Sequence, residues 1–139
     1  MLRITCLQKA LELINFQLEL IQFKSDNNNP TDKNPQLTRL LKYLERHYTE
    51  KITLQKVCDY MYMSANTVRR LLKKGVGRNL VSQIHYIRIQ HAMSLLRTTI
   101  DKISSIGYSV GFESPNDFCR IFKQETGTTP LKFRDSAAL

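Results

Sequence analysis

The sequence predicts an all-α fold in which two helix-turn-helix subdomains are joined by a long connecting helix, with an extra N-terminal amphipathic helix. Two observations support this prediction. Apolar residues recur at helical spacing through most of the chain, and no run alternates with the period of two typical of a β-strand. Residues 54–77 also match residues 103–127, with one residue inserted in the second copy, which indicates an internal repeat of one helical unit.

Length and composition limit the class of protein. The 139 residues suffice for one ordinary domain or two very small ones. With only 5 Gly and 4 Pro, the chain is neither collagen-like nor a Pro/Gly-rich disordered protein. Lys and Arg together number 21 against 12 Asp and Glu, so the formal net charge is +9. This excess predicts a polyanionic partner, either nucleic acid or an anionic membrane surface.

No segment has the composition of a membrane span or a signal peptide. A span needs about 18–20 uncharged apolar residues, whereas the most apolar segment, Leu7 to Phe23, contains Lys9, Glu12 and Glu19. The three cysteines are widely separated: Cys6, Cys58 and Cys119. An odd number of scattered cysteines favours reduced thiols in a cytoplasmic protein over a disulfide framework or a zinc site.

Residues 1–24 are expected to form the N-terminal amphipathic helix. Its apolar seam consists of Leu7, Leu11, Ile14, Leu18 and Ile21. Such a surface must cover the basic domain, pair with a second chain as a weak homodimer, or be the remnant of a larger effector-binding or dimerisation domain. Residues 25–35 are polar and contain two prolines, so they are expected to form a linker.

The net positive charge is confined to one part of the chain. Residues 1–35 contain four basic and four acidic side chains, whereas residues 36–134 contain seventeen basic and seven acidic side chains. The polyanion-binding surface is therefore expected within residues 36–134. A basic protein of the membrane surface is disfavoured, because the most amphipathic helix lies in the segment without net charge.

From residue 36 onward the apolar spacing predicts consecutive helices, the first of which ends near Thr49. Thr53 and Ser64 are candidate N-caps of the next two helices, and Gly75 and Gly77 are expected to end the second of these. The later helices are expected at about residues 81–97, 103–110, 114–125 and 130–134. The first helix-turn-helix motif then spans about residues 53–74, and the second about residues 103–125.

The two copies of the repeat align at an offset of 49 residues before the turn and 50 after it, because Glu113 is inserted in the second copy. In each copy a small residue, Cys58 or Gly107, is placed where the two helices come closest. In each copy an apolar pair is expected to pack the second helix against the first. The pair is Leu71 with Leu72 in the first copy, and Ile121 with Phe122 in the second. The opposite face of the second helix is left for a ligand.

That face carries amide and basic side chains in both copies: Asn66, Arg69, Arg70 and Lys73 in the first, and Asn116, Arg120 and Lys123 in the second. Arg reads guanine with two hydrogen bonds and Asn reads adenine, which is the chemistry of major-groove recognition. The alternative is a merely solvated polar face. The repetition of basic residues at equivalent positions favours DNA binding.

The second copy contains the motif Ile103-x-x-Ile106-Gly107-x-x-Val110-Gly111-Phe112, followed by Phe118-x-Arg120-x-Phe122-Lys123-x-x-x-Gly127-x-Thr129-Pro130-x-x-Phe133-Arg134. The connecting helix contains Arg88-Ile89-x-x-Ala92-x-x-Leu95-Leu96. On these residues, positions 36–134 resemble the two-motif DNA-binding domain of the AraC/XylS family of bacterial transcription regulators. The chain departs from that family's pattern in Gly107, where alanine is usual, in Phe133, where tyrosine is usual, and in the loose first turn Met61-Tyr62-Met63.

The resemblance implies a homeodomain-like, seven-helix domain whose two recognition helices enter successive major grooves. It also implies a transcription regulator of the bacterial cytoplasm and nucleoid, and specifically an activator that contacts RNA polymerase. The implied base contacts are Asn66, Arg69, Arg70, Pro115, Asn116, Cys119 and Arg120. The expected phosphate contacts are Thr53, Ser64, Thr67, Lys73, Ser114 and Lys123.

Several of these residues have alternative roles. Arg70 and Arg120 can instead bind a phosphate or form an ion pair within the protein. The carboxylates available for such a pair are those of Glu113, Asp117 and Glu125. Cys119 is either a contact to a thymine methyl group or a passive surface thiol.

No other group of residues indicates catalysis, so we expect neither an enzyme nor a cofactor. The sequence contains no phosphate-binding glycine loop, nucleophile elbow or cluster of metal ligands. His85 and His91 share no carboxylate or cysteine partner, which favours packing or surface roles, and Met61 and Met63 are expected to fill the core. The alternative function is a protein-interaction module that dimerises through residues 7–23 and binds DNA weakly and without sequence preference.

Overall fold

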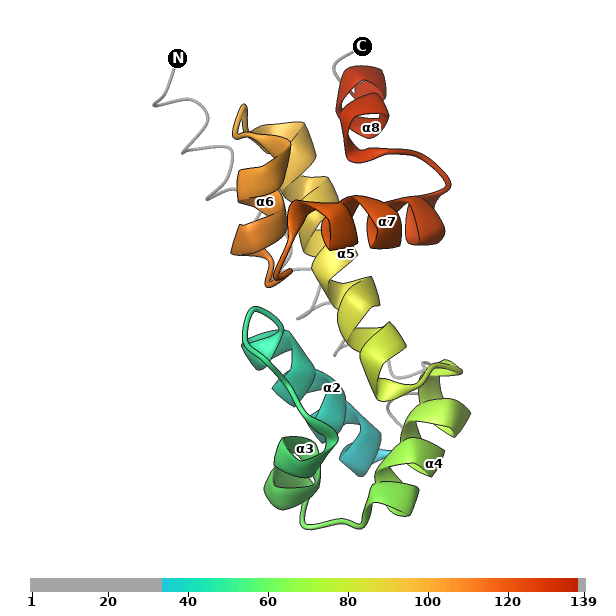
Figure 1. Ribbon diagram of the computed structural model, residues 1–139. Helices are drawn as coiled ribbons and strands as arrows, with labels where there is room; N and C mark the ends of the chain where they lie inside the picture. Colours follow the sequence, from blue (N-terminus) through green and yellow to red (C-terminus); the bar gives the residue numbers. More distant parts are fainter. Residues whose placement is uncertain (1–33, 138–139) are drawn as a thin grey trace.

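The computed structural model describes residues 34–137, and every regular element within that range is a helix. This confirms the predicted all-α class. The helices are α2 (Pro35–His47), α3 (Leu54–Met61), α4 (Ala65–Val76), α5 (Leu80–Thr98), α6 (Ile103–Ser109), α7 (Pro115–Thr126) and α8 (Pro130–Ala137) (Figure 1). The predicted amphipathic helix at residues 1–24 and nearly all of the predicted linker lie outside the described residues.

Helix α5 joins two helix-turn-helix motifs, which consist of α3 with α4 and of α6 with α7 (Figure 1). Helices α2, α3 and α4 lie near the N-terminal end of α5, whereas α6, α7 and α8 pack against α5 further along. Helix α5 is one residue longer at each end than the predicted 81–97. Its 19 residues span ~28 Å at the α-helical rise, so the two motifs are separated by a rigid element.

Each motif has its own apolar core, and α5 contributes to both. From α5, the first core receives Leu80, Ile84 and Ile87, and the second receives Ile89, Ala92 and Leu96. The second helix of each motif is anchored by side chains with no exposed surface: Val68 and Leu72 in α4, and Phe118 and Phe122 in α7. Burial of one such side chain contributes about 1.5–3 kcal/mol. These anchors therefore decide which face of α4 and of α7 is left exposed.

The predicted N-caps Thr53 and Ser64 are confirmed, and Ser114 caps α7 in the same way. The hydroxyls of Thr53, Ser64 and Ser114 each accept a hydrogen bond from the amide three residues further along the chain, at 3.2, 3.3 and 3.1 Å. Such a cap contributes about 1 kcal/mol to the stability of a helix. It also fixes the residue at which α3, α4 and α7 begin.

Gly107 lies at the closest approach of α6 and α7, as predicted. A Cβ atom at this position would be 2.9 Å from Cγ of Phe118, which is shorter than a normal van der Waals contact. Cys58 is buried at the equivalent position of the first motif. The small residue in each copy therefore allows the two helices of the motif to pack closely.

Gly75 does not end α4, which corrects the prediction from sequence. The helix continues to Val76 and ends at Gly77, which adopts the left-handed conformation with a φ of 73°. A Cβ atom at Gly75 would collide with the Leu37 side chain of α2. The glycine inside α4 is thus explained by the packing of α2 and not by the end of the helix.

The last two residues of the predicted linker instead belong to the start of α2. The side chain of Asn34 accepts hydrogen bonds from the amides of Gln36 and Leu37, and Pro35 is the first residue of the helix. Asn is favourable as an N-cap, and Pro is favourable at the first helical position because its missing N–H would have no partner there. The same residue types that favour a turn therefore begin a helix here.

Candidate nucleic-acid interface

Helix α4 presents an exposed face of amide and basic side chains. These are Asn66, Arg69, Arg70, Lys73 and Lys74. Nη1 of Arg69 lies 3.5 Å from Oδ1 of Asn66, so these two side chains adjoin at the start of the helix. No acidic residue occurs between Ala65 and Val76. This face is therefore uniformly cationic and suits a polyanion.

Helix α7 presents the equivalent face with mixed charge. Asn116, Arg120 and Lys123 are exposed on it. Nη2 of Arg120 lies 3.4 Å from Oδ1 of Asp117, so one of the ion pairs considered from sequence is present. Both side chains are more than half exposed, and exposed pairs contribute at most about 1 kcal/mol. The pair can therefore open when another anion approaches Arg120.

Two of the predicted base-contact residues are partly buried. Pro115 is the first residue of α7, and Cys119 packs against the second core. Each leaves only part of its surface for a ligand.

The predicted phosphate-contact residues include the caps at three helix N-termini. Thr53, Ser64 and Ser114 precede α3, α4 and α7, and the Thr67 hydroxyl lies 2.8 Å from that of Ser64. Each capping hydroxyl satisfies one amide of the first turn, so the other first-turn amides are left for water or an anion. The remaining two predicted contacts, Lys73 and Lys123, are exposed near the C-terminal ends of α4 and α7.

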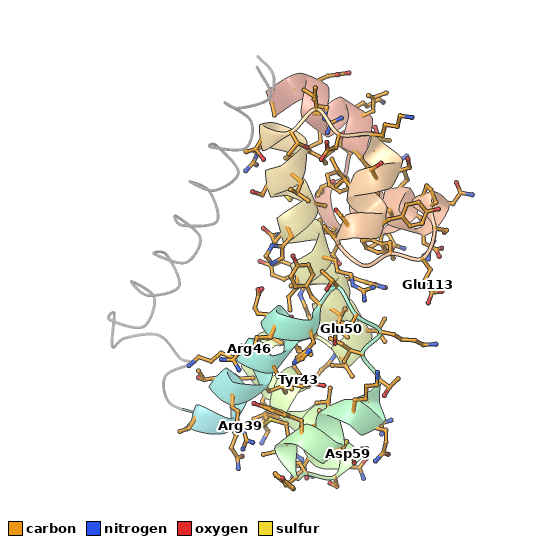
Figure 2. All side chains as sticks on the ribbon, turned by 90° about the vertical axis from the view of Figure 1, so that its left-hand side faces the viewer. Arg39, Tyr43, Arg46, Glu50, Asp59 and Glu113 are labelled. Atoms are coloured by element: carbon orange, nitrogen blue, oxygen red, sulfur yellow. The ribbon has the colours of Figure 1, made fainter. Side chains whose placement is uncertain are left out.

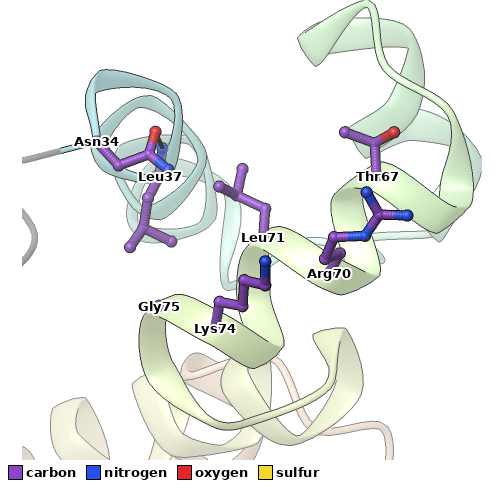
Figure 3. A pocket seen from close by; sticks show the side chains of 7 residues that line it. All are labelled: Asn34, Leu37, Thr67, Arg70, Leu71, Lys74 and Gly75. Atoms are coloured by element: carbon purple, nitrogen blue, oxygen red, sulfur yellow. Dashed lines mark hydrogen bonds between the residues drawn. The ribbon is translucent and has the colours of Figure 1, made fainter.

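A groove of about 310 Å³ lies between the start of α2 and α4 (Figure 3). Leu37 and Leu71 contribute apolar side chains to its lining, and Arg70 and Lys74 contribute cations from α4. Helical periodicity alone places these two cations on one face of α4. The same periodicity does not predict the groove, because the other wall of the groove is formed by residues at the start of α2.

The surface over α2 and α3 carries both signs of charge, unlike the exposed face of α4. Figure 2 shows this side with the labelled residues Arg39, Arg46, Glu50 and Asp59. The guanidinium of Arg39 lies 4.9 Å from the centre of the Tyr60 ring and donates a hydrogen bond to the carbonyl of Tyr60 at 3.3 Å. This side is therefore less suited to a polyanion than α4.

The histidines of α5 pack against aromatic rings, in agreement with the expected packing role. The ring of His91 stacks on that of Tyr48 at a centroid distance of 4.1 Å, and that of His85 on Phe112 at 5.9 Å. Nε2 of His91 also lies 3.0 Å from Oε2 of Glu45 in α2. The prediction that His91 has no carboxylate partner is therefore wrong, because Glu45 is 46 residues away in the chain and is brought close only by the packing of α2 on α5.

Burial shifts the pKa of one of these histidines. The pKa of His85 is lowered, mainly because the half-buried ring is desolvated and further because it lies near the cations Arg88 and Arg120. The carboxylates of Glu125 and Asp117 act in the opposite direction and are outweighed. His85 therefore favours its neutral form beside the Phe112 ring.

Within residues 34–137, no group of three or more His, Cys, Asp or Glu side chains is placed to hold a metal ion. No helix in the same range is long and apolar enough to cross a membrane.

Comparison with known proteins shows that residues 57–136 match a family model described as a helix-turn-helix domain. The transcriptional activator RhaS from Escherichia fergusonii is 29% identical over 125 residues, which cover 88% of this chain and 45% of the relative. The bifunctional transcriptional activator/DNA repair enzyme AdaA from Bacillus subtilis is 32% identical over 100 residues, which cover 72% and 47% of the two chains. The chain thus spans less than half the length of these curated relatives.

A solved structure has a similar arrangement of helices. It is a transcriptional regulator from Chromobacterium violaceum, described as containing an AraC-type DNA-binding domain. The match has a TM-score of 0.71 at 26% sequence identity, and it covers 75% of this chain and 93% of that one. The two motifs on a connecting helix are therefore found in a known regulator.

Proposed function

Because this chain belongs to the AraC/XylS family of helix-turn-helix transcription regulators, we propose that it binds double-stranded DNA sequence-specifically, with α4 and α7 in two successive major grooves. The observation that carries this proposal is the repetition of an exposed Asn, Arg and Lys face on two helices that pack at different positions along α5. The ~28 Å length of α5 is compatible with grooves ~34 Å apart, with some bending of the DNA.

We assign base contacts and phosphate contacts to different residues. Base contacts are assigned to Asn66, Arg69, Arg70, Pro115, Asn116, Cys119 and Arg120. Phosphate contacts are assigned to Thr53, Ser64, Thr67, Lys73, Ser114 and Lys123. The first group is supported by the exposed Asn and Arg side chains of α4 and α7 and, for Pro115 and Cys119, by the family pattern alone. The second group is supported by the helix N-termini at Thr53, Ser64 and Ser114 and by the exposed amines of Lys73 and Lys123.

We further propose that α4 dominates both affinity and base choice. Helix α4 carries no carboxylate, whereas Asp117 lies on α7 beside Arg120 and Glu113 immediately precedes the Ser114 cap. Two carboxylates at the start of α7 repel phosphate and weaken its contact with DNA.

The regulatory role is proposed from the relatives. RhaS and AdaA are both described as transcriptional activators, so we propose that this chain activates transcription in the bacterial cytoplasm through contact with RNA polymerase, and that it acts without catalysis. Weak self-association through residues 7–23 remains a proposal from sequence.

Selection of bound sequences from a random duplex pool tests the main proposal. We expect two short blocks of defined sequence, about one helical turn apart and different from each other, since the two recognition faces differ. Recovery of a random pool would contradict the proposal. It would favour the alternative function, an interaction module that binds DNA without sequence preference.

A further inference from the structure

An ion pair links the ends of the two recognition helices. Arg78 directly follows Gly77, which caps α4, and its Nη1 lies 3.3 Å from Oε2 and 3.4 Å from Oε1 of Glu125, near the end of α7. The side chains are one third and one fifth exposed. The guanidinium carbon of Arg78 also lies 4.4 Å from the centre of the Tyr86 ring of α5. The pair is thus held against α5 between residues 47 positions apart in the chain.

A second set of contacts, near the middle of α5, links the loop that precedes the first motif with the second motif. Nε of Arg88 donates a hydrogen bond to the carbonyl of Tyr48 at 2.7 Å, and Nη2 donates one to the carbonyl of Glu50 at 2.9 Å. The same guanidinium lies 5.6 Å from the centre of the Phe112 ring in the second motif. Tyr48 itself packs against both cores. Arg88 therefore connects the loop between α2 and α3 with the turn of the second motif.

These polar contacts restrict the orientation of the two motifs relative to each other more than apolar packing does. Apolar contacts have no angular preference, whereas guanidinium hydrogen bonds to carboxylates and carbonyls need a defined distance and angle. Partly buried ion pairs of this kind add little stability, but they can specify one arrangement. Arg78 and Arg88 therefore act on the placement of α4 relative to α7 more than on the folding of either motif.

We propose that Arg78 with Glu125, and Arg88 with the Tyr48 and Glu50 carbonyls, hold α4 and α7 at one separation, so that the protein selects the number of base pairs between its two half-sites. This inference rests on the proposed two-groove function. One inserted base pair moves a half-site by ~3.4 Å along the DNA and ~35° around it. A rigid pair of recognition helices cannot follow that change, whereas a loosened pair can follow part of it.

The test measures binding to the selected site and to duplexes with one base pair added or removed between the blocks. For the unmodified chain we expect a loss of about tenfold or more when the spacing changes. Arg78→Ala, Glu125→Gln and Arg88→Met should each reduce that loss to about threefold, and the double variant Arg78→Glu with Glu125→Arg should restore it. The ratio between spacings is compared because removal of a charge alters affinity for all DNA alike.

Arg97→Ala serves as the matched control, because the Arg97 guanidinium lies 5.1 Å from the Phe133 ring within the second half of the domain and does not join the two motifs. It should keep the full spacing penalty. Glu125→Gln preserves the shape of the side chain, so the spacing penalty of this variant tests the inference if an arginine variant fails to fold. An unchanged spacing penalty in folded Glu125→Gln, or equal binding of the unmodified chain to all spacings of a selected site, overturns this inference. Failure to distinguish a selected site from scrambled duplex would instead overturn the proposed function.

Discussion

Tyr62 and Gly111 occupy the same position in the two copies of the repeat, and both have a positive φ, of 54° and 109°. Each lies in the turn between the two helices of its motif. Their surroundings differ: Tyr62 is 89% exposed, whereas a Cβ at Gly111 would be 2.9 Å from the Tyr48 carbonyl oxygen and 3.0 Å from Cα of Thr49. The same turn is therefore open in the first motif and enclosed by backbone in the second.

This difference predicts unequal effects on stability. Gly111→Ala should lower the free energy of unfolding by about 2–3 kcal/mol, because the strained φ is combined with backbone contacts that cannot move away. Tyr62→Gly should not lower it, since the glycine relieves the left-handed strain and no buried contact is lost. Urea denaturation measures both changes. Gly127→Ala is the control, with a positive φ of 81° but open space around the added Cβ, and a loss as large as that of Gly111→Ala would contradict the account.

Substitution of the two central arginines should rank the recognition helices. Arg70→Ala should weaken binding to the selected site by about 1–3 kcal/mol and relax base preference in one half of it. Arg120→Ala should cost less and act on the other half, because the ion pair with Asp117 competes with DNA for the Arg120 guanidinium. Titration of both variants on the selected site and on base-substituted versions gives the ranking. If Arg120→Ala is the more damaging, α7 leads and the ranking is wrong.

The carboxylate beside Arg120 can be tested by itself. Asp117→Asn should strengthen DNA binding, since it removes a charge that repels phosphate and releases Arg120 from its ion pair. The same change should cost about 0.3–1 kcal/mol of stability, because an acidic side chain in the first turn of α7 interacts favourably with the helix dipole. DNA titration and urea denaturation measure the two effects separately. Weaker binding by Asp117→Asn would show that the carboxylate itself takes part in recognition.

Lys73→Ala distinguishes a phosphate contact from base recognition. The variant should bind selected and scrambled duplexes more weakly by the same factor, because a phosphate contact carries no sequence information. The slope of the logarithm of the binding constant against the logarithm of salt concentration should fall by about one. A change in base preference, with the slope unaltered, would assign Lys73 to a base edge.

The lowered pKa of His85 predicts a loss of stability in mild acid. The imidazole of His85 binds a proton more weakly in the folded protein than in the unfolded chain. The contribution of neutral His85 to the free energy of unfolding is therefore complete above the ordinary pKa of 6.5, and it decreases as the pH falls below that value. The melting temperature of the unmodified protein should therefore decrease between pH 7.5 and 5.5, and His85→Gln should show a smaller decrease. Equal decreases in the two proteins would exclude His85 as the cause.

Local signals in the sequence predicted much of the fold and the chemical character of the candidate site. The caps Thr53 and Ser64 and the apolar spacing each depend on neighbours within one or two turns, so the order and approximate bounds of the helices followed from the sequence. The role of Gly75 did not, because it depends on Leu37 of another helix. The Arg78–Glu125 pair was missed for the same reason, since 47 positions separate the two residues and only the packed structure brings them together.

The affinity ratio between the selected duplex and a scrambled duplex, measured at two salt concentrations, tests sequence-specific recognition by α4 and α7 most directly. The account predicts a preference of about 10³ or more for the selected duplex. Affinity for both duplexes should decrease as salt rises, because each binding event displaces counterions from phosphates. A ratio near one at both salt concentrations would contradict the account, since it would show that the basic residues bind phosphate alone.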